Sequence, residues 1–93
     1  MKDKHEFHFR LYVCGHTGRS QRAIAVLQKL CEEKLAGRSE LEVIDVLAEP
    51  GRADEDRVLA TPTLIKLAPA PIRRVVGDLS DPSRLGEALD LPD

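Results

Sequence analysis

A proline-rich stretch, residues 61–78, constrains the fold of this chain more than any other segment. Proline has no backbone N–H to donate and fixes its own φ angle, so it interrupts a sheet ladder and stops a helix. The apolar runs beside these prolines predict two short strands, residues 63–67 and 72–76, joined by a turn. A β-hairpin is therefore expected here.

The same stretch holds three X-Pro bonds, which precede Pro62, Pro69 and Pro71. The trans and cis forms of such a bond differ by only about 0.5 to 1 kcal/mol and interconvert slowly. We therefore treat the hairpin as a candidate conformational switch.

Composition favours one small cytoplasmic domain over residues 1–93, because 42% hydrophobic content supplies a single core. Two phenylalanines, one tyrosine and a net charge of −2 argue against a nucleic-acid partner. No run approaches the roughly 20 apolar residues that span a bilayer, so no membrane partner is expected. Two cysteines do not form a disulfide scaffold, which fits a reducing compartment.

Apolar periodicity predicts the elements of the first half. Residues 7–13 alternate apolar and polar side chains, which predicts a strand, and the turn-rich loop after it ends in residues that can cap a helix. Apolar residues then recur at helical spacing from Ala23 to Leu35, with Gly37 as the expected C-terminal cap. The β-branched run 41–47 predicts a second strand, parallel to the first through a right-handed crossover.

Proline positions divide the second half. Pro50 and Gly51 break the chain before a short charged helix, residues 52–59, which must end before the next proline. After the hairpin, Asp81 is expected to cap a last helix whose first position is Pro82. The apolar stripe of that helix is expected to consist of Leu85, Ala88 and Leu89.

The resulting order, β-α-β-α-β-β-α, resembles the thioredoxin-like fold, in which helices cover both faces of a central mixed four-stranded sheet. Cys14 follows the first strand, where thioredoxin-like enzymes carry their reactive thiol. Its Cys-Gly-His-Thr sequence lacks the second cysteine of a Cys-x-x-Cys pair but is similar to the Cys-Gly-Phe-Ser loop of monothiol glutaredoxins. A monothiol redox protein that uses Cys14 is therefore the alternative function.

Other interpretations of these residues are weaker. The spacing from Cys14 to Arg19 is one residue too short for the loop of cysteine phosphatases. Imidazole and thiolate suit zinc, but His8 alternates with apolar residues and His5 lies near the terminus, so neither a metal nor a cofactor is expected. Cys31 lies on the apolar helix stripe and is expected in the core.

Several blocks of residues together resemble the KaiB family of circadian-clock proteins and their bacterial relatives. The most specific are Leu-Ala-Thr-Pro-Thr-Leu at residues 59–64 and Gly-Asp-Leu-Ser-Asp at residues 77–81. The run Val-Ile-Asp-Val-Leu at residues 43–47 also matches. The resemblance extends without an evident gap from about Phe9 to Leu91.

The resemblance implies a non-enzymatic regulator that docks on the N-terminal ATPase ring of a KaiC-type hexamer. It also implies two folds for one sequence. The thioredoxin-like arrangement, expected as a monomer or small oligomer, binds KaiC in the family, and an alternative β-α-β-β-α-α-β arrangement assembles into tetramers.

Two surfaces are expected to bind partners. The edge of the second strand serves a further clock partner in the family, since an unpaired edge can accept a strand; the residues expected there are Leu41, Val43 and Asp45, the last exposed or capping. Positive residues that match family positions can steer the chain toward an acidic ring face. They are Arg22, Arg57, Lys66, Arg73 and Arg74.

Ala88 and Asp90 join the three prolines as candidate switch residues. Clock members often have glycine at the position of Ala88, and alanine is favoured over glycine inside a helix by roughly 1 kcal/mol. Because two folds of one sequence differ by only about a few kcal/mol, we expect Ala88 to favour the thioredoxin-like state.

Overall fold

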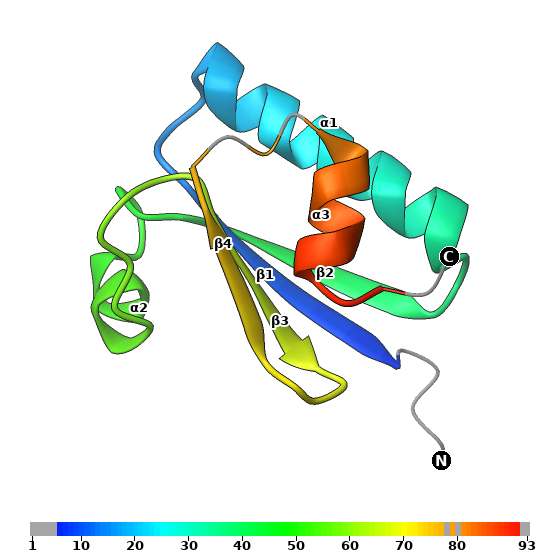
Figure 1. Cartoon of the computed structure of the whole chain (residues 1–93). Coiled ribbons are helices and arrows are strands. Elements are labelled where there is room, and N and C mark those ends of the chain that lie inside the picture. Colours follow the sequence, from blue (N-terminus) through cyan, green and yellow to red (C-terminus); the bar gives the residue numbers. More distant parts are fainter. Residues whose placement is uncertain (1–5, 78, 80, 92–93) are drawn as a thin grey trace.

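The computed structural model describes residues 6–77, 79 and 81–91. Its elements follow the predicted order β-α-β-α-β-β-α, and not the alternative order (Figure 1). They are β1 (Phe7–Val13), α1 (Gly18–Lys34), β2 (Ser39–Asp45), α2 (Pro50–Glu55), β3 (Thr63–Ala68), β4 (Arg73–Val76) and α3 (Pro82–Ala88).

The strands form one mixed four-stranded sheet in the order β2-β1-β3-β4 (Figure 1). β1 pairs parallel with β2 and antiparallel with β3, and β3 pairs antiparallel with β4, so the predicted crossover and hairpin are both confirmed. A parallel pair needs a long crossover, which α1 supplies, whereas an antiparallel pair needs only a short turn. β2 and β4 are therefore the two edges of the sheet.

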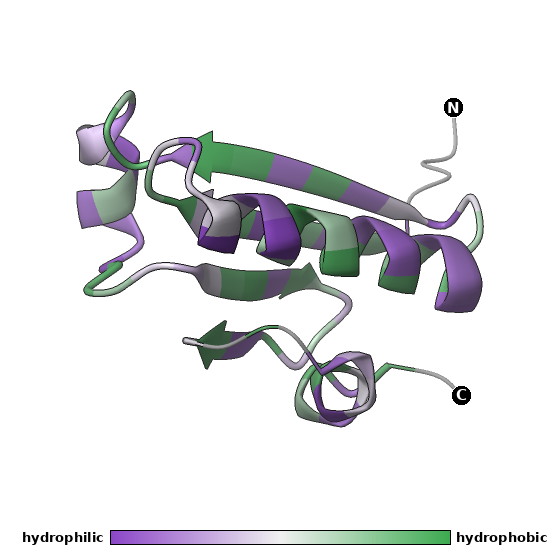
Figure 2. Cartoon of the chain, turned by 90° about the horizontal axis from the view of Figure 1, so that it is seen from above, coloured by the Kyte–Doolittle hydropathy of each residue, from purple (hydrophilic) through white to green (hydrophobic). Residues whose placement is uncertain are grey.

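Alternation along β1 divides the core into two layers. Phe9 and Leu11 belong to the layer beneath α1 and α3, where they join Leu27 and Leu85. Tyr12 belongs to the second layer, beneath α2. Figure 2 shows α1 and α3 as ribbons of mixed polar and apolar residues, which is typical of helices that cover one side of a sheet. The prediction of helices on both faces is confirmed.

Local capping signals account for the helix ends. The Thr17 hydroxyl accepts a hydrogen bond from the Ser20 N–H at 3.1 Å and so begins α1. The C-cap of α1 is Leu35 and not Gly37 as predicted; Gly37, two residues further on, has a φ of +72°, a conformation that glycine adopts without strain. Asp81 caps α3 and Pro82 occupies its first turn, as predicted.

The predicted bounds of β2 and α2 are wrong, β2 beginning two residues early at Ser39, and β3 and β4 each differ from prediction by one residue at one end. β2 ends at Asp45 and not at residue 47, because the Asp45 carboxylate accepts hydrogen bonds from the N–H groups of Gly15 at 3.0 Å and Leu47 at 2.9 Å, which turns the chain. α2 spans Pro50–Glu55 and not residues 52–59. Proline fits the first turn of a helix, and Arg57, with a φ of +54°, lies beyond the last turn.

The prediction that Ala88 belongs to the buried stripe of α3 is also wrong. Leu85 and Leu89 are buried, but Ala88 is exposed and Gly86 is buried in its place. A Cβ added to Gly86 would lie 3.6 Å from the Lys34 side chain, so α3 approaches the C-terminal end of α1 closely there.

A cluster of polar side chains fixes α2 to the sheet. The Tyr12 hydroxyl donates to the Asp56 carboxylate and lies 3.1 Å from the Arg52 carbonyl oxygen. Arg10 donates to the same carboxylate at 2.9 Å and to Glu42 at 3.2 Å. Glu42 also accepts two hydrogen bonds from the Arg52 guanidinium, at 2.7 and 3.0 Å. The cluster thus joins β1, β2 and the α2 region.

This arrangement shifts the pKa values of the phenol and the two carboxyl groups of the cluster. Burial and the hydrogen bond to Asp56 raise the pKa of Tyr12 to about 12. Burial also tends to raise the pKa of Asp56, but the hydrogen bonds from Tyr12 and Arg10 outweigh it and leave that pKa below its ordinary value. The hydrogen bond from Arg52, with that from Arg10, lowers the pKa of Glu42. All three shifts favour one protonation state, an ionised pair of carboxylates beside a neutral phenol.

The substitution Tyr12→Phe removes the hydroxyl donor from Asp56 without changing the shape of the ring. We expect the free energy of unfolding to fall by about 1 to 3 kcal/mol, since a partly buried charged acceptor loses a partner. Urea unfolding measures this loss. Arg19→Ala, at an exposed position on α1, serves as the control and should change stability by less than about 0.5 kcal/mol. A loss for Tyr12→Phe as small as that of the control would contradict the role of the cluster.

The lowered pKa values of Asp56 and Glu42 predict how stability depends on pH. The unfolded chain, with ordinary carboxyl pKa values near 4, takes up protons before the folded chain does. The stabilisation is therefore fully present above about pH 5 and is lost as the pH falls through the lowered values. Unfolding midpoints measured from pH 7 to pH 3 test this, and the decline should be shallower in Asp56→Asn. An equal decline in both proteins would reject the assignment.

Candidate partner-binding surfaces

The loop after β1 contains one accessible thiol. Cys14 is exposed, whereas Cys31 is buried in the α1 layer, where burial raises the pKa of its thiol. Cys31 is thus a core residue, as predicted, and is not placed to act as a second reactive thiol for Cys14. The Cys14 carbonyl oxygen accepts a hydrogen bond from the Ser20 hydroxyl at 3.3 Å.

The two histidines that the structure describes lie on different segments. His16 is exposed in the same loop, while His8 lies on β1 with its Nδ1 3.4 Å from Glu40. His5 lies outside the described residues. Across residues 6–77, 79 and 81–91, no three His, Cys, Asp or Glu side chains stand close enough together to hold a metal ion.

The outer edge of β2 is open, and its predicted residues lie along it. Val43 is 40% exposed and Leu41 is half-buried. Hydrogen bonds from the backbone N–H groups of Gly15 and Leu47 hold the pKa of Asp45 below its ordinary value. Asp45 therefore closes the turn after the edge strand, in line with the capping role predicted for it.

Of the predicted positive residues, Arg22, Arg57 and Arg73 are exposed. Arg22 lies on the second turn of α1, Arg57 follows α2, and Arg73 begins β4. These three arginines therefore come from three separate segments of the chain and do not form a stripe along one helix or strand.

The prediction that Lys66 steers a partner is wrong, because its side chain is only 1% exposed. Lys66 lies opposite Phe9 in the β1–β3 ladder, and residues opposite each other share a face of the sheet. Its long aliphatic stem therefore lies on the side covered by α1 and α3, and can pack there as an apolar chain does.

Arg74 is exposed but makes internal contacts. Its guanidinium donates to the carbonyl oxygens of Asp56 at 2.6 Å and Arg57 at 3.2 Å. A cation beside the carbonyl groups that follow a helix is a stabilising arrangement. Arg74 thus braces β4 against the segment after α2, a role that the sequence pattern did not predict.

The predicted switch positions occupy different environments. Pro62 is buried, Pro69 is half-buried and Pro71 is exposed, and all three follow cis peptide bonds. Ala88 is the last residue of α3. Asp90, with a φ of +58°, has the left-handed conformation that favours glycine.

A groove of about 310 Å³ between β4 and α3 was not predicted. Residues of both β4 and the α3 region line it, so the sequence pattern of either element alone does not indicate a groove. The residues that line it are Val75, Val76, Asp81, Arg84, Leu85 and Ala88. Within the described part of the chain, no helix is long and apolar enough to cross a membrane.

Comparison with solved structures supports the fold. The N-terminal domain of SasA from Synechococcus elongatus has a TM-score of 0.75 at 22% identity and covers 97% of this chain and 89% of that domain. Mitochondrial thioredoxin 3 from Saccharomyces cerevisiae has a TM-score of 0.73 at 18% identity and covers 94% of this chain and 79% of that protein. The chain therefore has a thioredoxin-like fold.

Sequence comparison identifies the family. A family model of the KaiB domain matches residues 10–91. The circadian clock oscillator protein KaiB of Nostoc punctiforme is 46% identical over 91 residues, which are 98% of this chain and 88% of that protein. The circadian clock protein KaiB3 of a Synechocystis strain is 42% identical over 89 residues, 96% of this chain and 87% of that protein. With nearly its whole length matched, this chain belongs to the KaiB family.

Proposed function

We propose that this chain is a non-enzymatic clock-type regulator that binds the N-terminal ATPase ring of a KaiC-like hexamer and modulates its phosphorylation or ATPase cycle. The observation that carries the proposal is the 46% identity to a circadian clock oscillator protein over 98% of this chain. The surface of the chain supports the proposal. It has open strand edges and exposed arginines, both of which suit docking to another protein.

Ring binding is proposed to use the exposed arginines Arg22, Arg57 and Arg73. Exposed cations speed the encounter with an acidic face and fix its register, and their effect weakens with salt. The open edge of β2, with Val43 exposed on it, is proposed to accept a strand from a further clock or signalling protein.

Charge reversal tests ring binding. We expect Arg22→Glu and Arg73→Glu each to weaken binding to a cognate KaiC-type hexamer by about tenfold or more, since each replaces an attraction by a repulsion. Pull-down and titration with the hexamer in ATP and in ADP measure the effect. Arg19→Glu, also exposed on α1 but not assigned to the interface, is the matched control and should bind as the unsubstituted protein does. Absence of a complex in either nucleotide would reject the proposal.

The redox alternative has one observation in its favour, the exposed Cys14 thiol. Cys14→Ala separates the two functions in the same binding assay. Unchanged ring binding by this variant, or ordinary thiol reactivity of Cys14 in a thiol titration, would exclude redox chemistry as the function; a Cys14 thiol that reacts much faster than an ordinary thiol would favour it.

We also propose that the thioredoxin-like arrangement exchanges with the alternative arrangement of the family. The first three elements, β1, α1 and β2, are common to both orders, so the residues that select between them lie in the second half. Ala88 is proposed to favour the present arrangement, because it is the last residue of α3 and alanine is a better helix residue than glycine.

Glycine substitutions test this selection. Ala88→Gly should reduce the population of the thioredoxin-like form, with a cost of up to about 1 kcal/mol to that form. Asp90→Gly should increase it, because glycine adopts the left-handed φ of residue 90 without strain. The populations of the two forms are measured by nitrogen–proton correlation spectra combined with a measurement of molecular size.

The matched control is Ala25→Gly. Residue 25 is exposed on α1, in the half that both arrangements share, so this change should weaken both forms and leave their ratio unchanged. A ratio that responds equally to Ala25→Gly and Ala88→Gly would show that Ala88 has no selective role.

A further inference from the structure

The edge of β4 leaves backbone groups available for another strand. Val75 lies opposite Leu64 in the β3–β4 ladder, and the Gly77 N–H donates to the Pro62 carbonyl at 3.0 Å. In an antiparallel pair, alternate residues direct their N–H and C=O groups toward the partner strand. The backbone groups of the intervening residues, Arg74 and Val76, therefore point outward.

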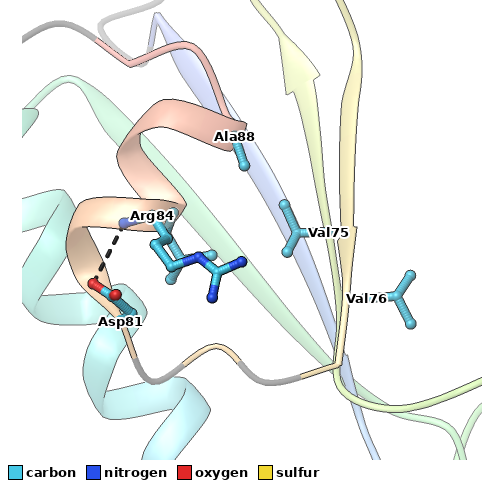
Figure 3. Close-up of a pocket in the computed structure, with 6 residues that line it drawn as sticks. Val75, Val76, Asp81, Arg84 and Ala88 are labelled. Atoms are coloured by element: carbon cyan, nitrogen blue, oxygen red, sulfur yellow. Dashed lines mark hydrogen bonds between the residues drawn. The ribbon is translucent and has the colours of Figure 1, made fainter.

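The groove beside this edge accepts side chains. Figure 3 shows Val75 pointing from β4 toward Ala88 on α3, with Arg84 reaching into the space between the two elements, while Val76 points away. Leu85, which is 3% exposed, also lines the groove, whose volume is about 310 Å³. Because side chains alternate across a sheet, every second residue of a strand added to β4 would face this groove.

One cation, Arg84, and one anion, Asp81, line the groove, and a second cation, Arg73, lies on the same strand as Val75. Arg73 lies two residues from Val75, so the two side chains share the face toward α3. No ion pair joins Arg73 or Arg84 to a carboxylate within the described ranges. The opposing charge is Asp81, whose carboxylate is occupied as the cap of α3, accepting from the Ser83 N–H at 3.0 Å.

We propose that the β4 edge and its groove bind an extended, acidic segment of a partner protein as a fifth strand of the sheet. The backbone of the segment pairs with Arg74 and Val76, an apolar side chain enters the groove over Val75, and carboxylates lie near Arg73 and Arg84. This proposal goes beyond ring binding, and a failure of ring binding would leave it unchanged, because it rests on the β4 edge, the groove and the charges of Arg73 and Arg84.

The charge of β4 favours an acidic occupant over a second copy of the chain. Arg73 and Arg74 attract carboxylates, whereas the β4 strand of a second copy would bring two further arginines to this edge and no carboxylate. The β2 edge has the opposite character, with the acidic residues Glu40, Glu42 and Asp45 and no lysine or arginine. The arginines of β4 therefore favour an acidic strand at that edge over one at β2, whose own residues include no lysine or arginine.

A short capped peptide of alternating glutamate and valine is the probe, titrated into the labelled full chain and followed by nitrogen–proton correlation spectra. We expect saturable shifts centred on Val75, Val76 and Arg84, with a Kd on the order of 0.1 to 1 mM, as suits a short strand addition. Arg84→Glu should weaken binding at least about tenfold. Ala88→Leu, which narrows the groove, should weaken it independently of charge.

The controls separate the edge from general attraction. A peptide of alternating lysine and valine should not bind at β4, and Arg19→Glu, away from the groove, should bind the glutamate peptide unchanged. Equal binding of the two peptides, shifts centred on β2, no saturable shift in the millimolar range, or β4 shifts that depend on protein concentration alone would each overturn the proposal. The last result would identify a second copy as the occupant.

Discussion

The antiparallel ladder between β1 and β3 is the contact on which the rest of this structure depends. It joins the N-terminal β1-α1-β2 unit to the C-terminal hairpin, and one of its pairs, Leu11 and Leu64, is fully buried. A slip of one residue would exchange the faces of Leu64 and Ile65, which belong to different core layers. Register at this ladder therefore places β4 at the edge and α3 beside it.

Features set by neighbouring residues were predictable from the sequence. The alternation in residues 7–13, the cap of α3 at Asp81 with Pro82 after it, and the hairpin around the prolines are all local signals, and all are confirmed. The fold class followed from the order of these elements. The resemblance to the KaiB family rested on contiguous blocks of sequence, which explains why it is confirmed over residues 10–91.

Features that depend on contacts between distant segments were not predictable. Arg74 and Lys66 both look like surface cations in the sequence, yet Arg74 donates to carbonyl groups after α2 and Lys66 is buried under the helices. Gly86 takes the buried position expected for Ala88, because α3 lies close to α1 there. The groove could not be predicted for the same reason. It lies between a strand and a helix, and the sequence pattern of neither one indicates how they are spaced.

The opposite charges of the two sheet edges have a consequence for assembly. β2 carries three carboxylates, whereas β4 begins with two arginines, and β1 and β3 separate the two edges. The strands proposed to add at β2 and at β4 would therefore lie at opposite edges of one sheet and would not compete for the same backbone groups. Under these two proposals, a chain of this size is a bridge with a fixed polarity, with a different partner at each edge.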